Sequence, residues 1–341
     1  MADCFIRKIG LAVLLLAAGA TSAGDFITGA GATFPSPAYL RWANSYQMED
    51  GIGVYYNPIG SSGGVEKILS KAVDFGATDV PMTQEELERN GLIQFPTLIG
   101  GVAPVINLDD VAEGQLKLSG NVLAGIFLGK ITRWNDARIA ADNNGVKLPN
   151  QEINVVHRVD GSGTTSTFTT YLSQVSAEWK SRMGAGSTVL WKAGVGIQGG
   201  GGMASYVKSV SGSIGYLEYP TIMQDKMNYA QLKNHDGNFV KPSAASFKAA
   251  SMGIESSTCF CEPMINKPGK DAWPITSATF ILAHKSAGAK KVLKFFEWAF
   301  DENDKKVFDL GYVQLPKKVW KGILSVCWSQ IPGGRFRMPW N

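Results

Sequence analysis

The sequence predicts an α/β protein with mostly parallel sheets, and its length suits two domains. Short apolar segments typical of buried strands alternate with segments in which apolar residues recur at helical spacing. Strands that alternate with helices in this way are typical of α/β architectures, in which helices cover a sheet. A chain of 341 residues is long enough for each of two domains to bury its own core. No internal repeat of about 20–50 residues is visible, which argues against a solenoid.

The predicted elements can be taken in chain order. Tyr39, Trp42 and Tyr46 recur at helical spacing and predict the first helix, whereas the apolar-rich run Ile153–Val156 is typical of a buried strand. The same two patterns predict, in order, a helix at 39–46, a helix at 65–72, a strand at 95–99, a strand at 153–156, a helix at 168–172, a strand at 214–217, a strand at 279–282 and a helix at 292–299. The four glycines at 199–202 predict a surface loop, with a flexible linker as the alternative.

The first 23 residues have the order of a secretory signal peptide. Arg7 and Lys8 precede the apolar segment 9–20, which is followed by the small residues 21–23. The apolar segment is shorter than the roughly 20 residues that a membrane span needs. We therefore expect cleavage after residue 23 and export of a mature chain that begins at Gly24, with a buried N-terminal helix as the alternative.

The charge and the cysteines exclude several classes of function. The formal net charge of +4 is spread along the chain, without the basic stripe and interleaved aromatics that nucleic-acid binding favours. Cys259, Cys261 and Cys327 are odd in number, so at least one thiol stays free after export. The one-residue spacing of the first two is not that of a zinc site, and the three histidines are far apart in the sequence. We expect no metal and no cofactor, whereas a small anionic ligand remains compatible with the composition.

Three glycine- and hydroxyl-rich segments, 29–35, 60–64 and 158–165, each lead into a predicted helix. The first N–H groups of a helix lack partners, and glycine allows a ligand to approach the backbone, so such a junction can bind an anion. A single junction of this kind is usually only a helix cap. Arg158 opens the third segment and can bind an oxyanion with two parallel hydrogen bonds, while Asp160 can hold the guanidinium in place. An ordinary surface ion pair is the alternative for these two residues.

The segment 60–64 also matches the G-x-S-x-G motif of serine hydrolases. That motif requires an acid and then a histidine later in the chain, and His284 is the only late candidate. Because His284 follows the predicted strand 279–282, it does not lie on a catalytic loop. A periplasmic serine hydrolase is therefore the weaker alternative.

Five segments occur in order along the chain: 28–35 (TGAGATFP), 60–64 (GSSGG), 74–79 (DFGATD), 158–164 (RVDGSGT) and 271–276 (DAWPIT). Together they resemble the periplasmic phosphate-binding proteins of the phosphate-specific ABC transport system. The resemblance extends from about Phe26 to about Leu315. It implies a two-lobed periplasmic-binding-protein fold with the ligand cleft between the lobes and a hinge of two crossing strands.

The resemblance also implies where the lobes divide. The signal peptide is 1–23, the first lobe is discontinuous and comprises 24–98 and 272–341, and the second lobe is 99–271. The hinge strands are expected near 99–102 and 268–273.

The same resemblance implies a phosphate site. Its ligand-binding residues are Thr33, Phe34, Ser61, Asp79, Arg158, Ser162, Gly163 and Thr164, with Asp160 supporting Arg158. Asp79 is the one acceptor among donors: an ionised carboxylate accepts a hydrogen that phosphate carries near neutral pH and repels sulfate, which carries none. Such a site can reject the analogue by roughly 10⁴–10⁵. The alternatives are that Asp79 only caps a turn, and that the ligand is another tetrahedral oxyanion such as sulfate.

The function implied by the resemblance is transport, without enzymatic activity. The protein is expected to bind inorganic phosphate in the periplasm as a monomer. It would deliver the anion to the inner-membrane permease subunits of an ABC-type importer, which work with a cytoplasmic ATPase. Two stretches, 251–264 and 317–341, depart from the family: they are rich in Trp or Cys, and the irregularity of their sequence suggests a shifted reading frame or a divergent tail.

Overall fold

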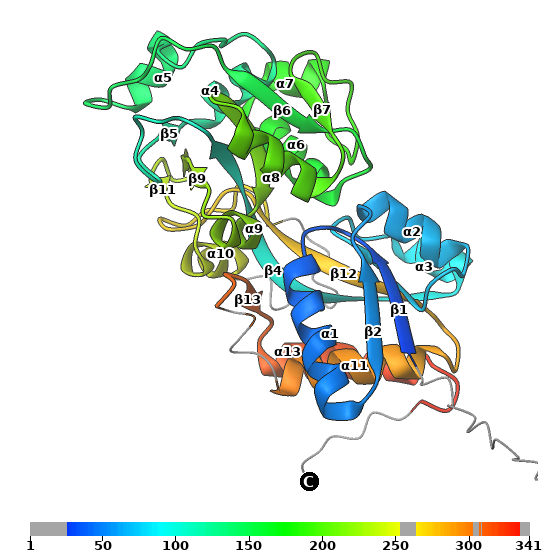
Figure 1. Cartoon of the computed structure of the whole chain (residues 1–341). Coiled ribbons are helices and arrows are strands. Elements are labelled where there is room, and N and C mark those ends of the chain that lie inside the picture. The colour runs from blue at the N-terminus through cyan, green and yellow to red at the C-terminus, as the bar shows by residue number, and fades with distance from the viewer. Residues whose placement is uncertain (1–25, 253–263, 303–306, 308, 335–341) are drawn as a thin grey trace, which may run out of the picture.

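The structure is a computed structural model that describes residues 26–252, 264–302, 307 and 309–334 (Figure 1). The predicted signal peptide 1–23, and Cys259 and Cys261 in the stretch 251–264, lie outside the described residues. No helix in the described part of the chain combines the length and the apolar character that crossing a membrane requires.

The described chain alternates strands and helices, as predicted. The main sheet has the order β2 (Gly53–Asn57), β1 (Phe26–Gly31), β3 (Phe75–Thr78), β12 (Thr276–His284), β4 (Leu92–Ile106), β8 (Ser213–Glu218), β6 (Asn154–Arg158) and β7 (Val195–Ile197), and β4 also pairs with β9 (Asn228–Tyr229) and β13 (Val313–Gln314). A small sheet joins β11 (Phe239–Val240), β10 (Gln231–Lys233) and β5 (Lys117–Leu118). The four predicted strands lie within or overlap β4, β6, β8 and β12 and are confirmed.

The sheet is mixed, so the prediction of mostly parallel sheets is wrong. β1 is parallel to β2 and β3, and β6 is parallel to β7 and β8, but β4 and β12 are antiparallel to each other. β12 is also antiparallel to β3, and β4 to β8. Two parallel sets are thus joined by one antiparallel pair.

β4 is shared by these two sets. Its residues Leu92–Gly101 pair with β12, and its residues Val102–Ile106 pair with β8. A second segment of the chain lies beside β4 at this point, just before β12. Its Ile275 carbonyl oxygen accepts from the Val102 N–H at 2.9 Å. The predicted hinge range 99–102 lies on β4, and the predicted range 268–273 lies just before the pairing with β4 begins.

The helices complete two groups of elements on either side of this junction (Figure 1). They are α1 (Ser36–Asp50), α2 (Ser61–Leu69), α3 (Gln84–Asn90), α4 (Gly120–Phe127), α5 (Ala137–Asp142), α6 (Gly163–Val175), α7 (Ala177–Arg182), α8 (Gly199–Ser209), α9 (Tyr219–Gln224), α10 (Ala244–Ser251), α11 (Ala289–Glu302) and α13 (Lys317–Ser329). The predicted helices coincide with α1, α2, α6 and α11 and are confirmed, although α2 ends at Leu69 instead of 72.

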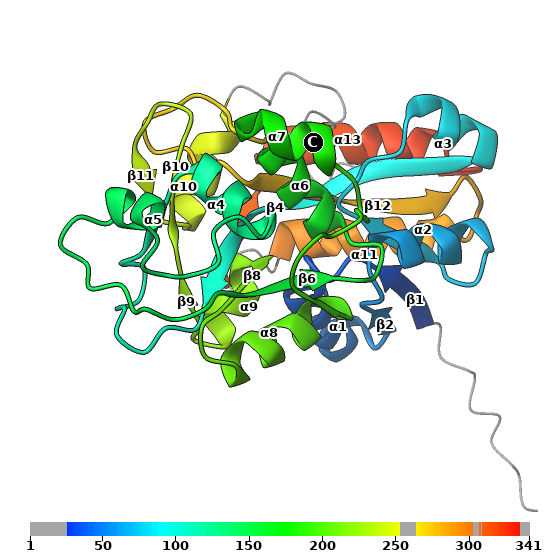
Figure 2. The same cartoon turned by 90° about the horizontal axis from the view of Figure 1, so that it is seen from above.

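We call the group formed by β1–β3, β12, α1–α3, α11 and α13 the β1 lobe, and the group formed by β6–β8 and α4–α8 the β6 lobe. The two groups occupy opposite ends of the molecule in Figure 1, joined by β4. Seen from above, α8 lies on one side of β6 and β8, and α6 and α7 lie on the other (Figure 2). Helices therefore cover both faces of this part of the sheet, as expected of an α/β fold.

The predicted surface loop at 199–202 is wrong, because these glycines form the first turn of α8. The Gly199 N–H donates to Asp160 Oδ1 at 2.9 Å, and Gly199 has a left-handed φ of 70°. A Cβ on the buried Gly200 would lie 3.1 Å from Glu218 Oε1 and 3.3 Å from Thr33 Oγ1. Contacts with distant segments therefore hold the glycine run in a helix that local propensity disfavours.

Residues 317–329 of the divergent stretch 317–341 form α13. One face of this helix buries Trp320, Leu324, Cys327 and Trp328, and the Trp320 ring lies 5.4 Å from that of Phe300 on α11. Burial raises the pKa of the Cys327 thiol to about 12. The C-terminal segment is thus part of the core of the β1 lobe.

Candidate functional site

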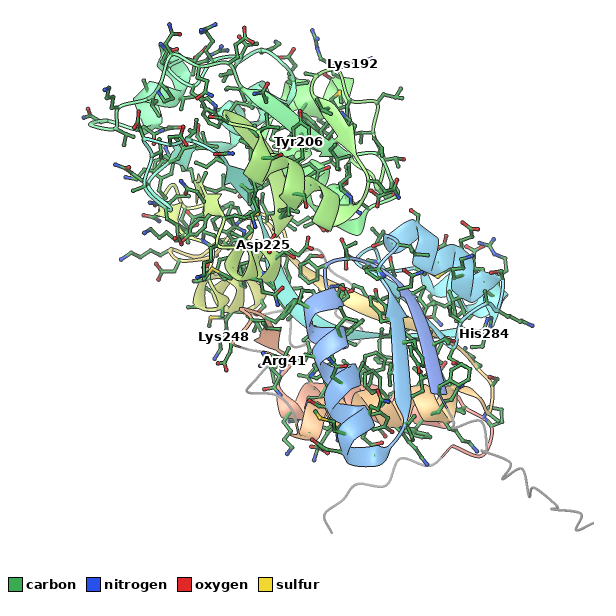
Figure 3. All side chains as sticks on the ribbon, in the orientation of Figure 1. Arg41, Lys192, Tyr206, Asp225, Lys248 and His284 are labelled. Carbon is green, nitrogen blue, oxygen red and sulfur yellow. The ribbon has the colours of Figure 1, made fainter. Side chains whose placement is uncertain are left out.

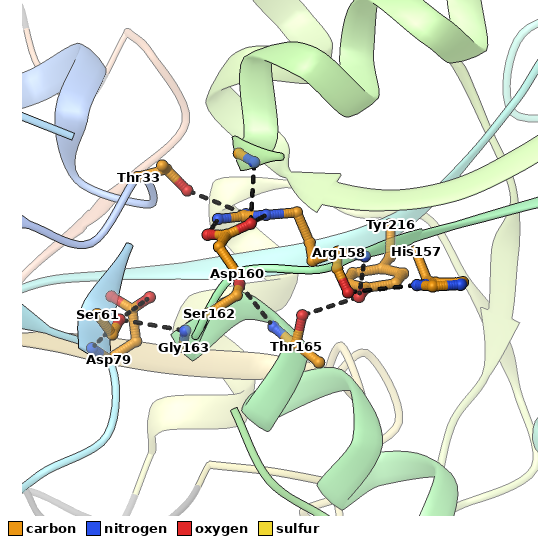
Figure 4. A network of polar contacts seen from close by, with 11 residues as sticks. Thr33, Ser61, Asp79, His157, Arg158, Asp160, Ser162, Gly163, Thr165 and Tyr216 are labelled. Atoms are coloured by element: carbon orange, nitrogen blue, oxygen red, sulfur yellow. Dashed lines mark hydrogen bonds and ion pairs between the residues drawn. The ribbon is translucent and has the colours of Figure 1, made fainter. Parts of the chain in front are cut away.

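Four helix starts meet between the two lobes. The Thr33 hydroxyl before α1 lies 3.4 Å from Arg158 Nη1, and the Gly163 N–H at the start of α6 donates to Ser61 Oγ at 3.1 Å (Figure 4). The Ser62 N–H of α2 donates to the Gly161 carbonyl at 3.1 Å. Residues about 100 or more positions apart in the sequence are therefore in direct contact, and the start of α8 joins them through its bond to Asp160.

The loop between β1 and α1 presents two backbone donors. The N–H of Ala32 donates to the Ala77 carbonyl at 2.9 Å, and the helix hydrogen bonds begin with the N–H groups that follow Pro35. Within the described residues, the N–H groups of Thr33 and Phe34 have no acceptor. Free N–H groups at a helix start are suited to bind an anion.

Arg158 and Asp160 form a buried, two-point ion pair, so a surface ion pair is excluded. Arg158 Nε donates to Asp160 Oδ1 at 2.7 Å and Nη2 donates to Oδ2, and the side chains are 1% and 8% exposed. Burial favours a high pKa for Asp160, but the hydrogen bonds and charge of Arg158 outweigh it and lower that pKa. Asp160 therefore holds the edge of the guanidinium formed by Nε and Nη2. Nη1 is directed toward Thr33 and can donate to a ligand (Figure 4).

Asp79 is a buried acceptor next to Ser61. The Ser61 hydroxyl accepts from the Asp79 N–H at 3.2 Å and donates to Asp79 Oδ2 at 3.4 Å. Burial raises the pKa of Asp79 to about 7, and the negative charge of Glu218 acts in the same direction. A cavity of about 230 Å³ adjoins Asp79 and is lined from both sides, by Thr167 of α6 and Thr276 of β12 among others. The carboxyl group thus borders the space between the lobes.

The start of α6 combines a cap with a free hydroxyl. Ser162 Oγ accepts from the Thr165 N–H at 3.1 Å, and the Ser162 N–H donates to the Ser187 carbonyl at 3.0 Å. Ser162 is therefore the N-cap of α6, and only its hydroxyl hydrogen is left to donate. The Thr164 hydroxyl is buried and has no hydrogen-bond partner among the described residues.

Three buried polar atoms of this region lack a partner within the described residues: Asp79 Oδ1, Thr164 Oγ1 and Glu218 Oε2. Buried polar atoms are nearly always hydrogen-bonded in folded proteins, so these three atoms are available to a further partner. The structure therefore brings together all the predicted site residues, with Thr33, Phe34 and Ser61 on one side and Arg158 and 162–164 on the other.

Two features of the site were missed by the sequence analysis. Glu218, the last residue of β8, is 2% exposed and accepts from the Thr221 hydroxyl at 3.0 Å. The sequence did contain a signal for Glu218, because this acidic residue directly follows the predicted apolar strand 214–217. The other is the start of α8, where the Gly200 backbone lies against Glu218 and Thr33. Three carboxylates, of Asp79, Asp160 and Glu218, accompany Arg158, so an anion here must rely mainly on N–H and O–H dipoles.

The hydrolase alternative finds no support in the geometry. His284 Nε2 lies 2.7 Å from the Ile68 carbonyl oxygen, six residues or about 9 Å along α2 from Ser62. Figure 3 shows His284 at the outer edge of the β1 lobe, away from the β6 lobe. His157 stacks on Trp191, and His235 pairs with Asp236, and no hydrogen bond joins either histidine to Ser62 among the described residues.

Comparison with known proteins gives consistent results. The profile of the PBP superfamily domain matches residues 17–303. The "Phosphate-binding protein PstS" of Pasteurella multocida is 45% identical over 341 aligned residues, which cover 98% of this chain and 99% of the relative. The protein of the same name from Xylella fastidiosa is 47% identical over 303 residues, covering 87% and 83%. The solved phosphate-binding protein from Stenotrophomonas maltophilia superposes with a TM-score of 0.69 at 20% identity, over 89% of this chain and 94% of that one, and shows that the fold is shared.

Proposed function

Because this chain belongs to the PstS family of phosphate-binding proteins, within the PBP superfamily, we propose that it captures inorganic phosphate for an ABC-type importer. The observation that carries the proposal is the convergence of helix starts, Arg158 and unpartnered buried polar atoms between the lobes. Fixed N–H and O–H donors in a water-poor cleft can replace the hydration shell of a small anion.

The phosphate contacts follow from the directions of these groups. The donors are the Thr33 hydroxyl and N–H, the Phe34 N–H, the Ser61 hydroxyl and N–H, Arg158, the Ser162 hydroxyl, the Gly163 N–H and the Thr164 hydroxyl. Asp79 Oδ1 accepts a hydrogen of the phosphate, and Asp160 holds Arg158. The Gly163 N–H donates to Ser61 Oγ at 3.1 Å, and the Ser61 hydroxyl donates to Asp79 Oδ2 at 3.4 Å. On binding, both donors turn from these acceptors to the anion.

Capture requires the lobes to move. We place the first lobe at 24–98 and 272–341 and the second at 99–271, with the hinge where β4 passes from β12 to β8. The bonds Ser62 N–H to Gly161 and Arg158 to Thr33 join the two lobes, which supports our assignment of this arrangement to the closed form. Opening breaks these few bonds and exposes the site.

Export and docking complete the proposal. Residues 1–23 direct the chain to the periplasm, where the closed monomer docks on the inner-membrane permease and its cytoplasmic ATPase drives release. The protein performs no chemistry on phosphate.

Calorimetric titration of the mature protein with phosphate, arsenate and sulfate tests the proposal. We expect tight binding of phosphate and arsenate and weaker binding of sulfate. Incubation with a model phosphate ester tests for hydrolysis, and we expect none. Absence of phosphate binding would refute the proposal, and a preference for sulfate would assign the site to that anion.

A further inference from the structure

The backbone of the loop Gly31–Phe34 is held by hydrogen bonds on every carbonyl oxygen. The Gly31 carbonyl accepts from the Gly60 N–H at 2.8 Å, and the Thr33 carbonyl accepts from the Ser36 N–H at 3.1 Å. The other two carbonyls accept from tyrosine hydroxyls. Ala32 O accepts from Tyr56 Oη at 2.6 Å, and Phe34 O accepts from Tyr312 Oη at 2.5 Å. All four carbonyls are thus occupied, while the Thr33 and Phe34 N–H groups are free.

The two tyrosines come from segments far apart in the sequence. Tyr56 lies on β2, and Tyr312 directly precedes β13, which pairs with β4 at Leu98 and Ile99. Tyr56 is 8% exposed and Tyr312 is 1% exposed. Burial raises the pKa of both hydroxyls well above the ordinary value, so each remains a protonated donor at any physiological pH.

The Tyr56 bond acts on the peptide unit that contains the Thr33 N–H. The Ala32 carbonyl and the Thr33 N–H belong to one planar amide, so a donor on the oxygen fixes the direction of the N–H. It also polarises the amide, and chains of hydrogen bonds strengthen one another in a poorly solvated interior. The Thr33 N–H is therefore both aimed and strengthened as a donor toward an anion.

The Tyr312 bond acts on the next part of the loop. The Phe34 carbonyl belongs to the amide with Pro35, which has no N–H, so the bond only fixes how residue 34 is turned. The Tyr312 ring also packs edge-on against the Phe34 ring, with centroids 5.8 Å apart. Together these contacts hold Phe34, and with it the Phe34 N–H, in place.

We propose that Tyr56 and Tyr312 are positioning residues of the anion site, which do not touch the ligand: Tyr56 sets the direction and donor strength of the Thr33 N–H, and Tyr312 holds the Phe34 N–H in place. The inference rests on the proposed function, since it takes phosphate as the ligand. It adds a role for the C-terminal segment, because the Tyr312 hydroxyl reaches the loop from the far end of the chain.

Three single-atom deletions test the proposal: Tyr56→Phe, Tyr312→Phe and the control Tyr39→Phe. Tyr39 is 1% exposed, its ring lies 5.1 Å from that of Tyr56, and its hydroxyl bonds Thr97 Oγ1 at 2.6 Å, away from the loop. Each of the three changes removes one buried hydrogen bond from the same core, so we expect the melting temperature to fall by a similar amount in all three variants. The phosphate Kd should rise roughly 3–10-fold in the first two variants, and less than about twofold in the control.

A second measurement separates positioning from general loosening. In the phosphate-bound protein, the Thr33 amide proton should resonate at higher field in Tyr56→Phe than in the parent and in the control, because its hydrogen bond to the anion is weaker. A parent that does not bind phosphate refutes the proposed function. A parent that binds, with all three variants equally affected or with an unchanged Thr33 resonance in Tyr56→Phe, refutes the positioning role. If Tyr56→Phe fails to fold, the comparison of Tyr312→Phe with Tyr39→Phe decides.

Discussion

The substitution Asp79→Asn should change how the protein distinguishes sulfate from phosphate. Sulfate carries no hydrogen near neutral pH, so it can bind only after Asp79 has taken up a proton and can donate it. Phosphate carries one or two hydrogens there and can donate to the ionised carboxylate. The pH at which sulfate is rejected is therefore set by the pKa of Asp79, which burial raises to about 7.

The magnitude follows from this pKa. Above this pKa, the protonated fraction of the Asp79 carboxyl falls tenfold per pH unit. The free energy needed to protonate Asp79 before sulfate binds is therefore about 1.4 kcal/mol at pH 8 and about 2.7 kcal/mol at pH 9. A carboxyl at the ordinary value of 3.8 would instead reject sulfate by about 10⁴ at pH 8, as the sequence analysis expected. Burial therefore makes the selectivity due to Asp79 weaker near neutrality and dependent on pH.

Titrations of both anions in about one-unit steps between pH 6 and pH 9 measure the effect. In the parent, sulfate affinity should be level below about pH 6 and fall about tenfold per unit above pH 7. In Asp79→Asn it should be nearly constant, because the amide donates at every pH, and useful phosphate affinity should remain through the amide oxygen. A parent whose sulfate affinity does not change above pH 7, or a variant that rejects sulfate as strongly as the parent at pH 9, would contradict the reasoning.

The stability of the protein without ligand provides an independent check on the same pKa. The folded state binds the Asp79 proton more tightly than the unfolded state, so this contribution is complete below about pH 4 and is lost as the pH rises to about 7. The difference between about 7 and 3.8 corresponds to roughly 4 kcal/mol. Asp79→Asn should therefore gain stability relative to the parent as the pH rises over this range, in chemical unfolding measured at several pH values.

Three further predictions concern the guanidinium, lobe closure and export. Arg158→Lys keeps the charge but loses the planar fork, so the phosphate Kd should rise at least about tenfold in calorimetry; equal affinity would exclude Arg158 as the clamp. Gly161→Ala places a Cβ 2.2 Å from Ser62 Oγ across the lobes, whereas Gly201→Ala meets nothing within 4 Å. We expect phosphate to decrease the radius of gyration in small-angle scattering, and only the first variant should weaken phosphate binding and prevent this decrease; equal behaviour of the two would argue against closure at this contact. N-terminal sequencing of the periplasmic fraction should begin at or near Gly24, and a full-length cytoplasmic chain would contradict the export signal.

Local patterns were sufficient where the structure depends on neighbouring residues. The strands around 95–99 and 214–217 and the helices α1 and α11 follow from the spacing of their apolar side chains, which is a property of the segment itself. The junctions at 60–64 and 158–165 were recognisable for the same reason, because helix caps and glycine turns are made by adjacent residues. The resemblance to a known family then indicated which of these junctions belong to one site.

The tertiary structure decided what depends on segments that are distant in the sequence. The glycine run 199–202 is helical because Asp160, Glu218 and Thr33 surround it, and the tail at 317–329 is ordered because α11 covers its apolar face. The pKa of Asp79 depends on how completely both lobes exclude water from it. Burial, and the contact of Tyr312 with the loop before α1, arise only when the whole chain packs, since no pattern within one segment specifies what will lie against it.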